Sequence, residues 1–176
     1  MGKGVGVSNL LRPLDEVPTQ CYLGTGLHTL GLLGWILEQT GKADVWVSTF
    51  STSDAFLCGF LNLKRRGLVG RSVLMADMKA SRKTMQLYRL MHNCFDRVLL
   101  SMNHSKVVLV QTDTQTVTVI TSQNQTYGDR AECTMVTTES EAFFSIREGF
   151  EDIAQNKSME LDGLFKRLTG RDKEGC

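Results

Sequence analysis

The sequence lacks the features that define several classes of protein. No apolar run approaches the roughly 18 residues of a membrane-spanning helix, so we expect no association with a membrane. The five cysteines form no Cys-x-x-Cys pair and are odd in number. This argues against a disulfide framework or a zinc ribbon, and it favours reduced thiols, most of them buried, in a cytoplasmic protein. The net charge is only +1, so any site for a polyanion has to be local.

The hydrophobic pattern that is present predicts an α/β domain. Strand patterns occur at Cys21–Leu23, Val45–Phe50, Ser72–Ala76, Phe95–Met102, His104–Val110, Thr116–Thr121 and Ala131–Thr137. Helix patterns occur at Leu27–Gln39, after Ser53, at Lys79–His92, at Glu139–Ile153 and at about Met159–Leu168. Because helices and strands alternate in the first half, we expect one mixed β-sheet flanked by helices on both faces. The expected organisation is a flexible leader (1–19), one domain (20–156) and a C-terminal helix and tail (157–176).

The first candidate for chemistry is a cationic pair at the start of an apolar strand. On a strand, His104 and Lys106 project from the same face. After the next strand, Ser122 and Asn124 return beside them. This set suits an oxyanion, because lysine supplies charge and asparagine supplies hydrogen bonds. The imidazole is then available as a nucleophile or as an acid or base.

Two other stretches have features of an anion or nucleotide site. Ser51 and Ser53 lie in a hydroxyl-rich turn before a helix, where backbone N–H groups favour an anion and a substrate phosphate is a candidate ligand. Simple helix capping is the alternative interpretation of the same two serines. The Gly-rich stretch from Gly24 to Gly31 fails the Gly-x-Gly-x-x-Gly pattern of dinucleotide sites, because Thr29 stands where the third glycine is required.

The residues around His104 resemble the signature of the phospholipase D superfamily, which is His-x-Lys-x4-Asp followed by Gly-Ser-x-Asn and a later acidic residue. His104-Ser-Lys106 matches the first part, Thr121-Ser122-Gln-Asn124 the second and Glu132 the third. Two positions differ: Gln111 stands in place of the aspartate and Thr121 in place of the glycine. The resemblance implies a phospholipase D-like fold, and the two departures bear on catalysis rather than on the fold.

The resemblance also implies roles for these residues. His104 would be the nucleophile or the general acid, Lys106 and Asn124 would hold the phosphoryl oxygens, Ser122 would support them and Glu132 would orient an imidazole. Such a site uses no metal or cofactor and passes through a phosphohistidine. The mechanism needs two His-x-Lys motifs and the chain has one, so a homodimer is expected.

Three functions remain open on the sequence alone. The first is a metal-independent phosphodiesterase or nuclease that acts on nucleic acid. The second, motivated by Gln111 and Thr121, is a catalytically degenerate nucleic-acid-binding or regulatory module. The third is a scaffold that uses the dimer surface.

Overall fold

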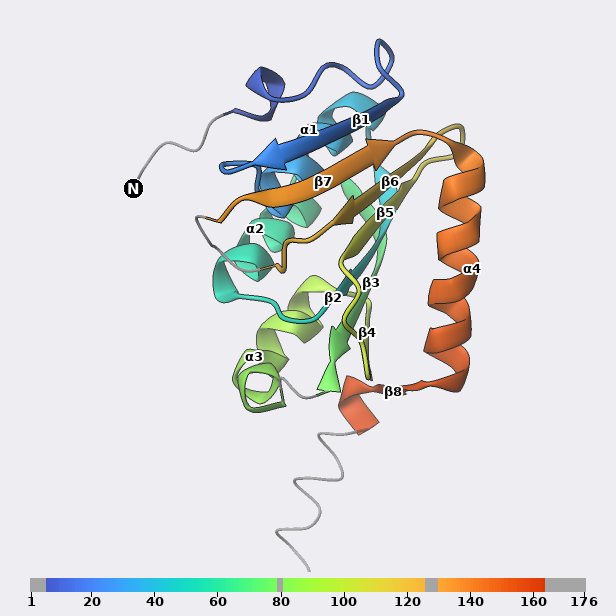
Figure 1. Cartoon of the computed structure of the whole chain (residues 1–176). Helices are drawn as coiled ribbons and strands as arrows, with labels where there is room; N and C mark the ends of the chain where they lie inside the picture. Colours follow the sequence, from blue (N-terminus) through green and yellow to red (C-terminus); the bar gives the residue numbers. More distant parts are fainter. Residues whose placement is uncertain (1–5, 79–80, 126–129, 164–176) are drawn as a thin grey trace, which may run out of the picture.

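One eight-stranded sheet organises the chain, with the strand order β1-β7-β6-β5-β2-β3-β4-β8 (Figure 1). The computed structural model describes residues 6–78, 81–125 and 130–163. The strands are β1 (Thr19–Gly24), β2 (Ala43–Thr49), β3 (Val69–Asp77), β4 (Arg97–Ser101), β5 (Val107–Gln111), β6 (Thr116–Thr121), β7 (Glu132–Thr137) and β8 (Ser158–Glu160). The helices are the 3-10 turn η1 (Val7–Asn9), α1 (Thr29–Thr40), α2 (Asp54–Arg65), α3 (Ser81–Cys94) and α4 (Ser140–Asn156).

The sheet is mixed, as expected from the order of the elements. β2, β3 and β4 are parallel, whereas β1, β7, β6 and β5 pair antiparallel with their neighbours and β8 pairs antiparallel with β4. The carboxyl ends of β2, β3 and β4 therefore meet the start of β5, the end of β6 and the start of β7 at a single end of the sheet. In open α/β sheets, ligands bind beyond the carboxyl ends of the parallel strands.

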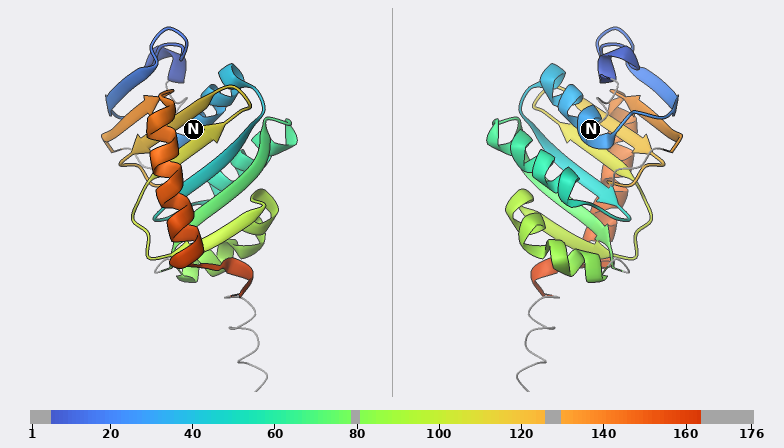
Figure 2. Two further views of the ribbon diagram at one scale, coloured as in Figure 1. Left: turned by 90° about the vertical axis from the view of Figure 1, so that its right-hand side faces the viewer. Right: turned by 90° about the vertical axis from the view of Figure 1, so that its left-hand side faces the viewer.

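Helices cover both faces of the sheet: α1, α2 and α3 lie on one face and α4 on the other (Figure 2). Because side chains alternate along a strand, Val108 and Val110 face the first group while Leu109 faces α4. On the α4 face, Trp46 packs edge-on against Phe143 at a ring-centroid distance of 6.3 Å. The guanidinium of Arg147 lies 3.6 Å above the centre of the Trp46 ring. The fold class predicted from the sequence is confirmed.

Local chemistry explains why α2 begins and ends where it does. Ser53 is the N-cap, and its hydroxyl oxygen accepts a hydrogen bond from the backbone N of Phe56 at 3.3 Å. Lys64 and Arg65 lie in the last turn, where the helix dipole favours cations. Gly67 follows with φ of 77°, a backbone conformation that favours glycine and ends the helix.

Three sequence-based predictions differ from the structure at the ends of the domain and at the cysteines. Met159 and Glu160 belong to β8 rather than to a helix, because the open edge of β4 pairs with them. The remainder of the predicted C-terminal helix beyond residue 163 lies outside the described residues. In the leader, Leu11 and Leu14 are buried in the core, so the packed chain starts before residue 20. Most cysteines were expected to be buried, but three of the four described ones are exposed, namely Cys21, Cys58 and Cys133.

The thiol of Cys94 differs from these three, and the difference can be measured. Burial, and to a smaller extent the neighbouring Cys58, raises the pKa of Cys94 to about 11. At pH 8 this thiol therefore stays protonated and shielded, while alkylation requires an exposed thiolate. We expect iodoacetamide to modify Cys21, Cys58 and Cys133 of the native protein while Cys94 reacts only after denaturation, as read by peptide mass spectrometry. Equal labelling of Cys94 in the native protein would contradict this burial.

Candidate functional site

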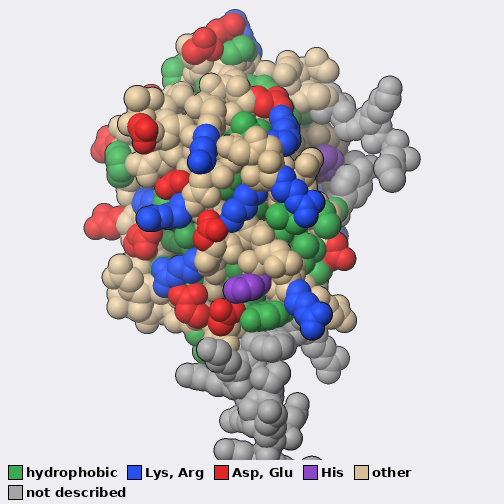
Figure 3. Space-filling view, turned by 180° about the vertical axis from the view of Figure 1, so that it is seen from behind, with side chains coloured by type: hydrophobic (Ala, Val, Ile, Leu, Met, Phe, Trp, Pro, Cys, Tyr) green, Lys and Arg blue, Asp and Glu red, His purple; other side chains and the backbone are tan. Residues whose placement is uncertain are grey.

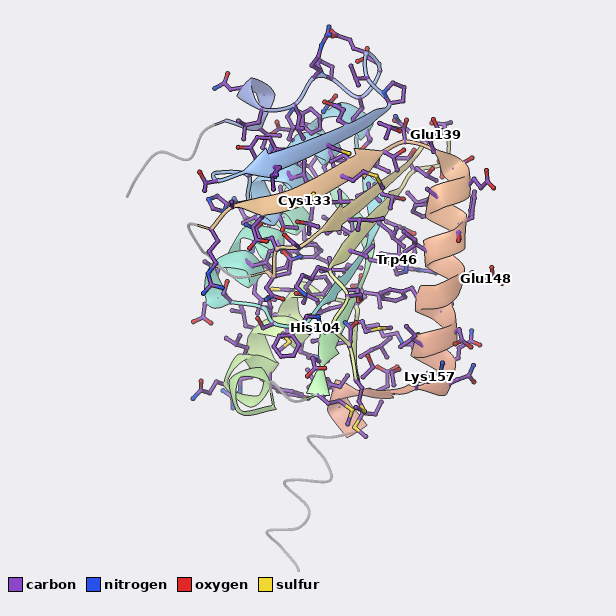
Figure 4. All side chains as sticks on the ribbon, viewed as in Figure 1. Trp46, His104, Cys133, Glu139, Glu148 and Lys157 are labelled. Carbon is purple, nitrogen blue, oxygen red and sulfur yellow. The ribbon has the colours of Figure 1, made fainter. Side chains whose placement is uncertain are left out.

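The sequence-predicted residues lie at the end of the sheet where the parallel strands finish. Ser48, near the end of β2, pairs with Val107 at the start of β5. The backbone N of Thr121 donates to the carbonyl oxygen of Lys106 at 3.1 Å, so the end of β6 lies beside the same point. Thr121 in turn pairs with Thr134 of β7. Figure 4 shows His104 and Cys133, which follows Glu132, toward the end of the sheet away from the β5–β6 hairpin.

The segment that carries the cationic pair is a loop, which corrects the predicted strand. β5 begins at Val107, and residues 103–106 have no regular secondary structure. The physical reason is Asn103, which is 6% exposed and whose side chain occupies hydrogen-bonding positions beyond the strand ends. Asparagine competes well with the backbone for such bonds. The strand argument that placed His104 and Lys106 on one face therefore does not apply.

Asn103, which follows β4, bonds the loop to the ends of β2 and β3. Its amide nitrogen donates to Ser48 Oγ at 2.9 Å and to the carbonyl oxygens of Thr49 and Met75 at 3.3 Å each. Its amide oxygen accepts from Ser105, at 3.0 Å from the backbone N and 2.7 Å from Oγ. The backbone N of Asn103 donates to a carboxylate oxygen of buried Asp77 at 2.9 Å. These bonds hold the residues on both sides of His104.

Sequence reasoning missed this network. Its one sign in the sequence is Asn103 itself, a polar residue that separates two apolar strands immediately before the histidine. Ser48 adds to the network, because its hydroxyl lies 2.5 Å from the hydroxyl of Ser105. Neither Ser48 nor Asp77 stands near His104 in the chain, so only the fold identifies them as supports of the loop.

The imidazole of His104 is exposed and packs on Phe50, with ring centroids 5.1 Å apart and planes inclined by 55°. Among the described residues it has no hydrogen-bond partner. Lys106 is half-buried, and its ammonium group donates to the carbonyl oxygen of His104 at 2.9 Å. An aromatic support and a fixed backbone thus present the ring to solvent beside a positive charge.

Ser122 and Glu132 form a separate pair at the same end of the sheet. The hydroxyl of Ser122 donates to the carboxylate of Glu132 and accepts from the backbone N of Cys133 at 3.0 Å. Within the described part of the chain, no hydrogen bond joins Glu132 to His104. The expected role of Glu132 in orienting an imidazole therefore stays a prediction.

Asn124 lies in a segment that runs across the turn between β2 and α2. The backbone N of Gln125 donates to the carbonyl oxygen of Ser51 at 3.1 Å. Ser53 Oγ donates to the carbonyl oxygen of Gln125 at 3.0 Å while it caps α2, so this hydroxyl is already engaged. The amide oxygen of Asn124 is buried and has no hydrogen-bond partner among the described residues. Asn124 therefore lies beside the turn between β2 and α2, with a buried amide oxygen.

The two departures from the family pattern do not disturb this end of the sheet. Gln111 lies at the opposite end of β5, where it pairs with Asp44 and Thr116. Thr121 occupies the glycine position without strain, since no described residue other than glycine has a positive φ. Its hydroxyl accepts from the backbone N of Gln123 at 3.1 Å and lies 2.8 Å from the hydroxyl of Thr134.

The charge on the surface is mixed rather than of one sign. On the face seen in Figure 3, Lys and Arg side chains alternate with Asp and Glu side chains. Lys64 pairs with Asp96 at 2.6 Å and Arg66 with Glu38 at 3.3 Å. Burial opposes the charge on Asp96, but hydrogen bonds from Lys64 and Ser72 outweigh it and hold the pKa of this carboxyl below its ordinary value. No cluster of three or more His, Cys, Asp or Glu side chains suited to a metal occurs among the described residues.

Comparisons with known proteins identify the fold. No family model matches the chain and no curated protein is similar in sequence. Among solved structures, NucT from Helicobacter pylori superposes with a TM-score of 0.60 at 11% identity over 79% of this chain and 98% of its own. Polyphosphate kinase from Porphyromonas gingivalis gives a TM-score of 0.58 at 13% identity over 83% of this chain, but the match spans only 30% of the kinase.

A third solved structure with this fold is TrmBL2, an archaeal chromatin protein described as having a novel mode of DNA binding. It superposes with a TM-score of 0.52 at 6% identity over 86% of this chain and 57% of its own. At identities this low the three matches establish a shared fold and nothing further. Within the described residues, no helix is long and apolar enough to cross a bilayer.

Proposed function

We propose that this chain, which has the fold of the phospholipase D superfamily, is a metal-independent phosphodiesterase that acts on nucleic acid. The observation that carries the proposal is the exposed imidazole of His104 on an anchored loop, with Lys106 on the same loop and Asn124 at the end of the adjacent β6. An ammonium group and amide groups can stabilise charge that develops on phosphoryl oxygens. Phosphoryl transfer requires mainly such positioning and charge stabilisation.

The proposed reaction has two steps. In the first, an imidazole nitrogen of His104 attacks phosphorus and the bond from phosphorus to the leaving oxygen breaks. A second, protonated imidazole gives its proton to that oxygen, which leaves a phosphohistidine. In the second step, water attacks phosphorus, its proton passes to the second imidazole and the bond from phosphorus to nitrogen breaks.

The second imidazole is proposed to be His104 of another copy, in a C2 homodimer. His92 is poorly placed for the role, because α3 ends where β4 begins, at the opposite end of the sheet. Large apolar side chains are exposed near the candidate site: Met102 is 81% exposed just after β4, and Leu23 is 77% exposed near the end of β1. Exposed apolar side chains at a symmetric contact would support dimerisation.

The first test is hydrolysis in the presence of a chelator. We expect the purified protein to cleave single-stranded DNA and bis(p-nitrophenyl) phosphate at a rate that EDTA leaves unchanged, and acid-labile, base-stable label from substrate phosphate to remain on the protein after quenching. Loss of activity in EDTA with recovery on adding Mg²⁺ would contradict the mechanism.

A second candidate function is DNA binding without turnover. The likeness to the DNA-binding TrmBL2 favours it, together with Gln111 and Thr121 at two signature positions. It predicts binding that weakens steeply with salt, as expected when phosphate contacts release counterions, and no cleavage. Hydrolysis in the presence of EDTA and retention of label on the protein therefore distinguish DNA binding without turnover from the phosphodiesterase.

A further inference from the structure

A cavity of about 550 Å³ adjoins the candidate site. Its walls come from η1 and Gly6 before it, from α1 between Thr29 and Glu38, and from the start of α2. Its floor is the segment 123–125. Asn124 therefore belongs both to the candidate phosphate site and to this cavity. A volume of this size is typical of pockets that hold small organic ligands.

The walls of the cavity suit a flat, uncharged ring. Leu30, Trp35 and Phe56 supply apolar surface, and Gly31 and Gly34 leave the face of α1 between them without side chains. Glu38 is the one Asp, Glu, Lys or Arg side chain among the described lining residues. Glu38 is paired with Arg66 at 3.3 Å, and no Lys or Arg is among the described lining residues. A phosphate group is therefore favoured beside Lys106 rather than inside the cavity.

The floor carries buried amide groups. Gln125 is 2% exposed and lines the cavity, and within the described part of the chain neither its amide nitrogen nor its amide oxygen has a hydrogen-bond partner. The amide oxygen of Asn124 is also buried and has no hydrogen-bond partner among the described residues. Unpaired buried amides are destabilising. The amide of Gln125 holds a donor and an acceptor side by side, and this pair matches the edge of a nucleobase once the buried side chain turns toward the cavity.

We propose that this cavity binds an unpaired nucleobase of the strand whose phosphate occupies the candidate site. The proposal rests on the proposed function and narrows its substrate to single-stranded nucleic acid. In a duplex the base would first have to leave its stack and its partner. The neighbouring phosphate would lie at Asn124, which links the two sites.

Binding to catalytically blocked protein tests this inference. In the full-length His104→Ala chain, Gly31→Leu would place a side chain in the cavity, and a Cβ at Gly31 meets only Val7 at 3.8 Å. The matched control is Gly149→Leu on α4, where a Cβ meets nothing within 4 Å. The probes are a labelled single-stranded DNA oligomer and an abasic oligomer of equal length, followed by fluorescence anisotropy, with thermal unfolding as the check on folding.

We expect Gly31→Leu to weaken binding of the base-containing strand about 10-fold or more while abasic binding and the Gly149→Leu control stay unchanged. Equal binding of both oligomers by the unmodified cavity would overturn the nucleobase site but leave the proposed function standing. Failure of both oligomers to bind would overturn the two together. If Gly31→Leu unfolds the chain, Trp35→Ala replaces it, with the same loss expected for the base-containing strand alone.

Discussion

Replacement of His104 by alanine is expected to lower kcat/KM for phosphodiester hydrolysis by about 10⁴-fold or more, because it removes the nucleophile and, in a dimer, the general acid as well. The imidazole is exposed and packs on the ring of Phe50. Its removal should therefore leave the free energy of unfolding nearly unchanged. Hydrolysis and thermal unfolding, measured on the same preparation, separate the two effects.

The two other histidines supply matched controls for His104→Ala. His92→Ala removes an exposed imidazole at the opposite end of the sheet and should leave the rate unchanged. His28 lies before α1 and lines the cavity, so His28→Ala should change substrate binding more than kcat. A loss of kcat on His28→Ala as large as that of His104→Ala would mean that the second imidazole comes from the same chain.

Replacement of Asn103 by alanine is expected to reduce both stability and activity. It leaves the hydroxyl of Ser48, the carbonyls of Thr49 and Met75 and the N–H of Ser105 without their present partner. Loss of such a buried network should lower the free energy of unfolding by about 2–4 kcal/mol. Without the side-chain bonds from residue 103 to Ser48, Met75 and Ser105, the loop would misplace His104. A displacement of about 1 Å can lower the rate about 10²-fold.

The control for this variant is Asn156→Ala, which removes an exposed asparagine bonded to Asp152 on α4. Urea unfolding measures the stability of both variants, and hydrolysis is followed far below the unfolding transition so that only folded protein contributes. A rate unchanged in Asn103→Ala, with the expected loss of stability, would show that the network supports the fold but does not position His104.

Local patterns in the sequence were sufficient for most elements of the fold. The Val and Leu run of β5 and the Thr and Val alternation of β6 predicted these strands, and the capping residues Ser53 and Gly67 marked the ends of α2. These signals act between near neighbours in the chain. β8 could not be predicted, since its formation depends on the unpaired edge of β4, whose position follows from the whole sheet.

The candidate site, like the fold, could be predicted from the sequence only in part. The motif identified His104, Lys106, Ser122, Asn124 and Glu132, and the register of β5, β6 and β7 brings their strand ends to one end of the sheet. The loop conformation of His104 could not be predicted, because it depends on bonds from Asn103 to Ser48 and Met75, which lie 55 and 28 residues away. Spacing in the chain carries no information on contacts of that range.

If two copies of His104 complete one site, a dimer that holds a single His104 lacks either the nucleophile or the general acid. An isolated mixed dimer measures this. Wild-type and His104→Ala chains with different tags would be co-expressed and the mixed dimer purified through both tags, with a wild-type and His92→Ala pair as the control. We expect the mixed dimer to be inactive. An unsorted equal mixture, in which about a quarter of the dimers are wild type on both sides, then retains about a quarter of the wild-type activity. A mixed dimer with half the activity of the wild type, or a fully active monomer in sedimentation, would contradict it.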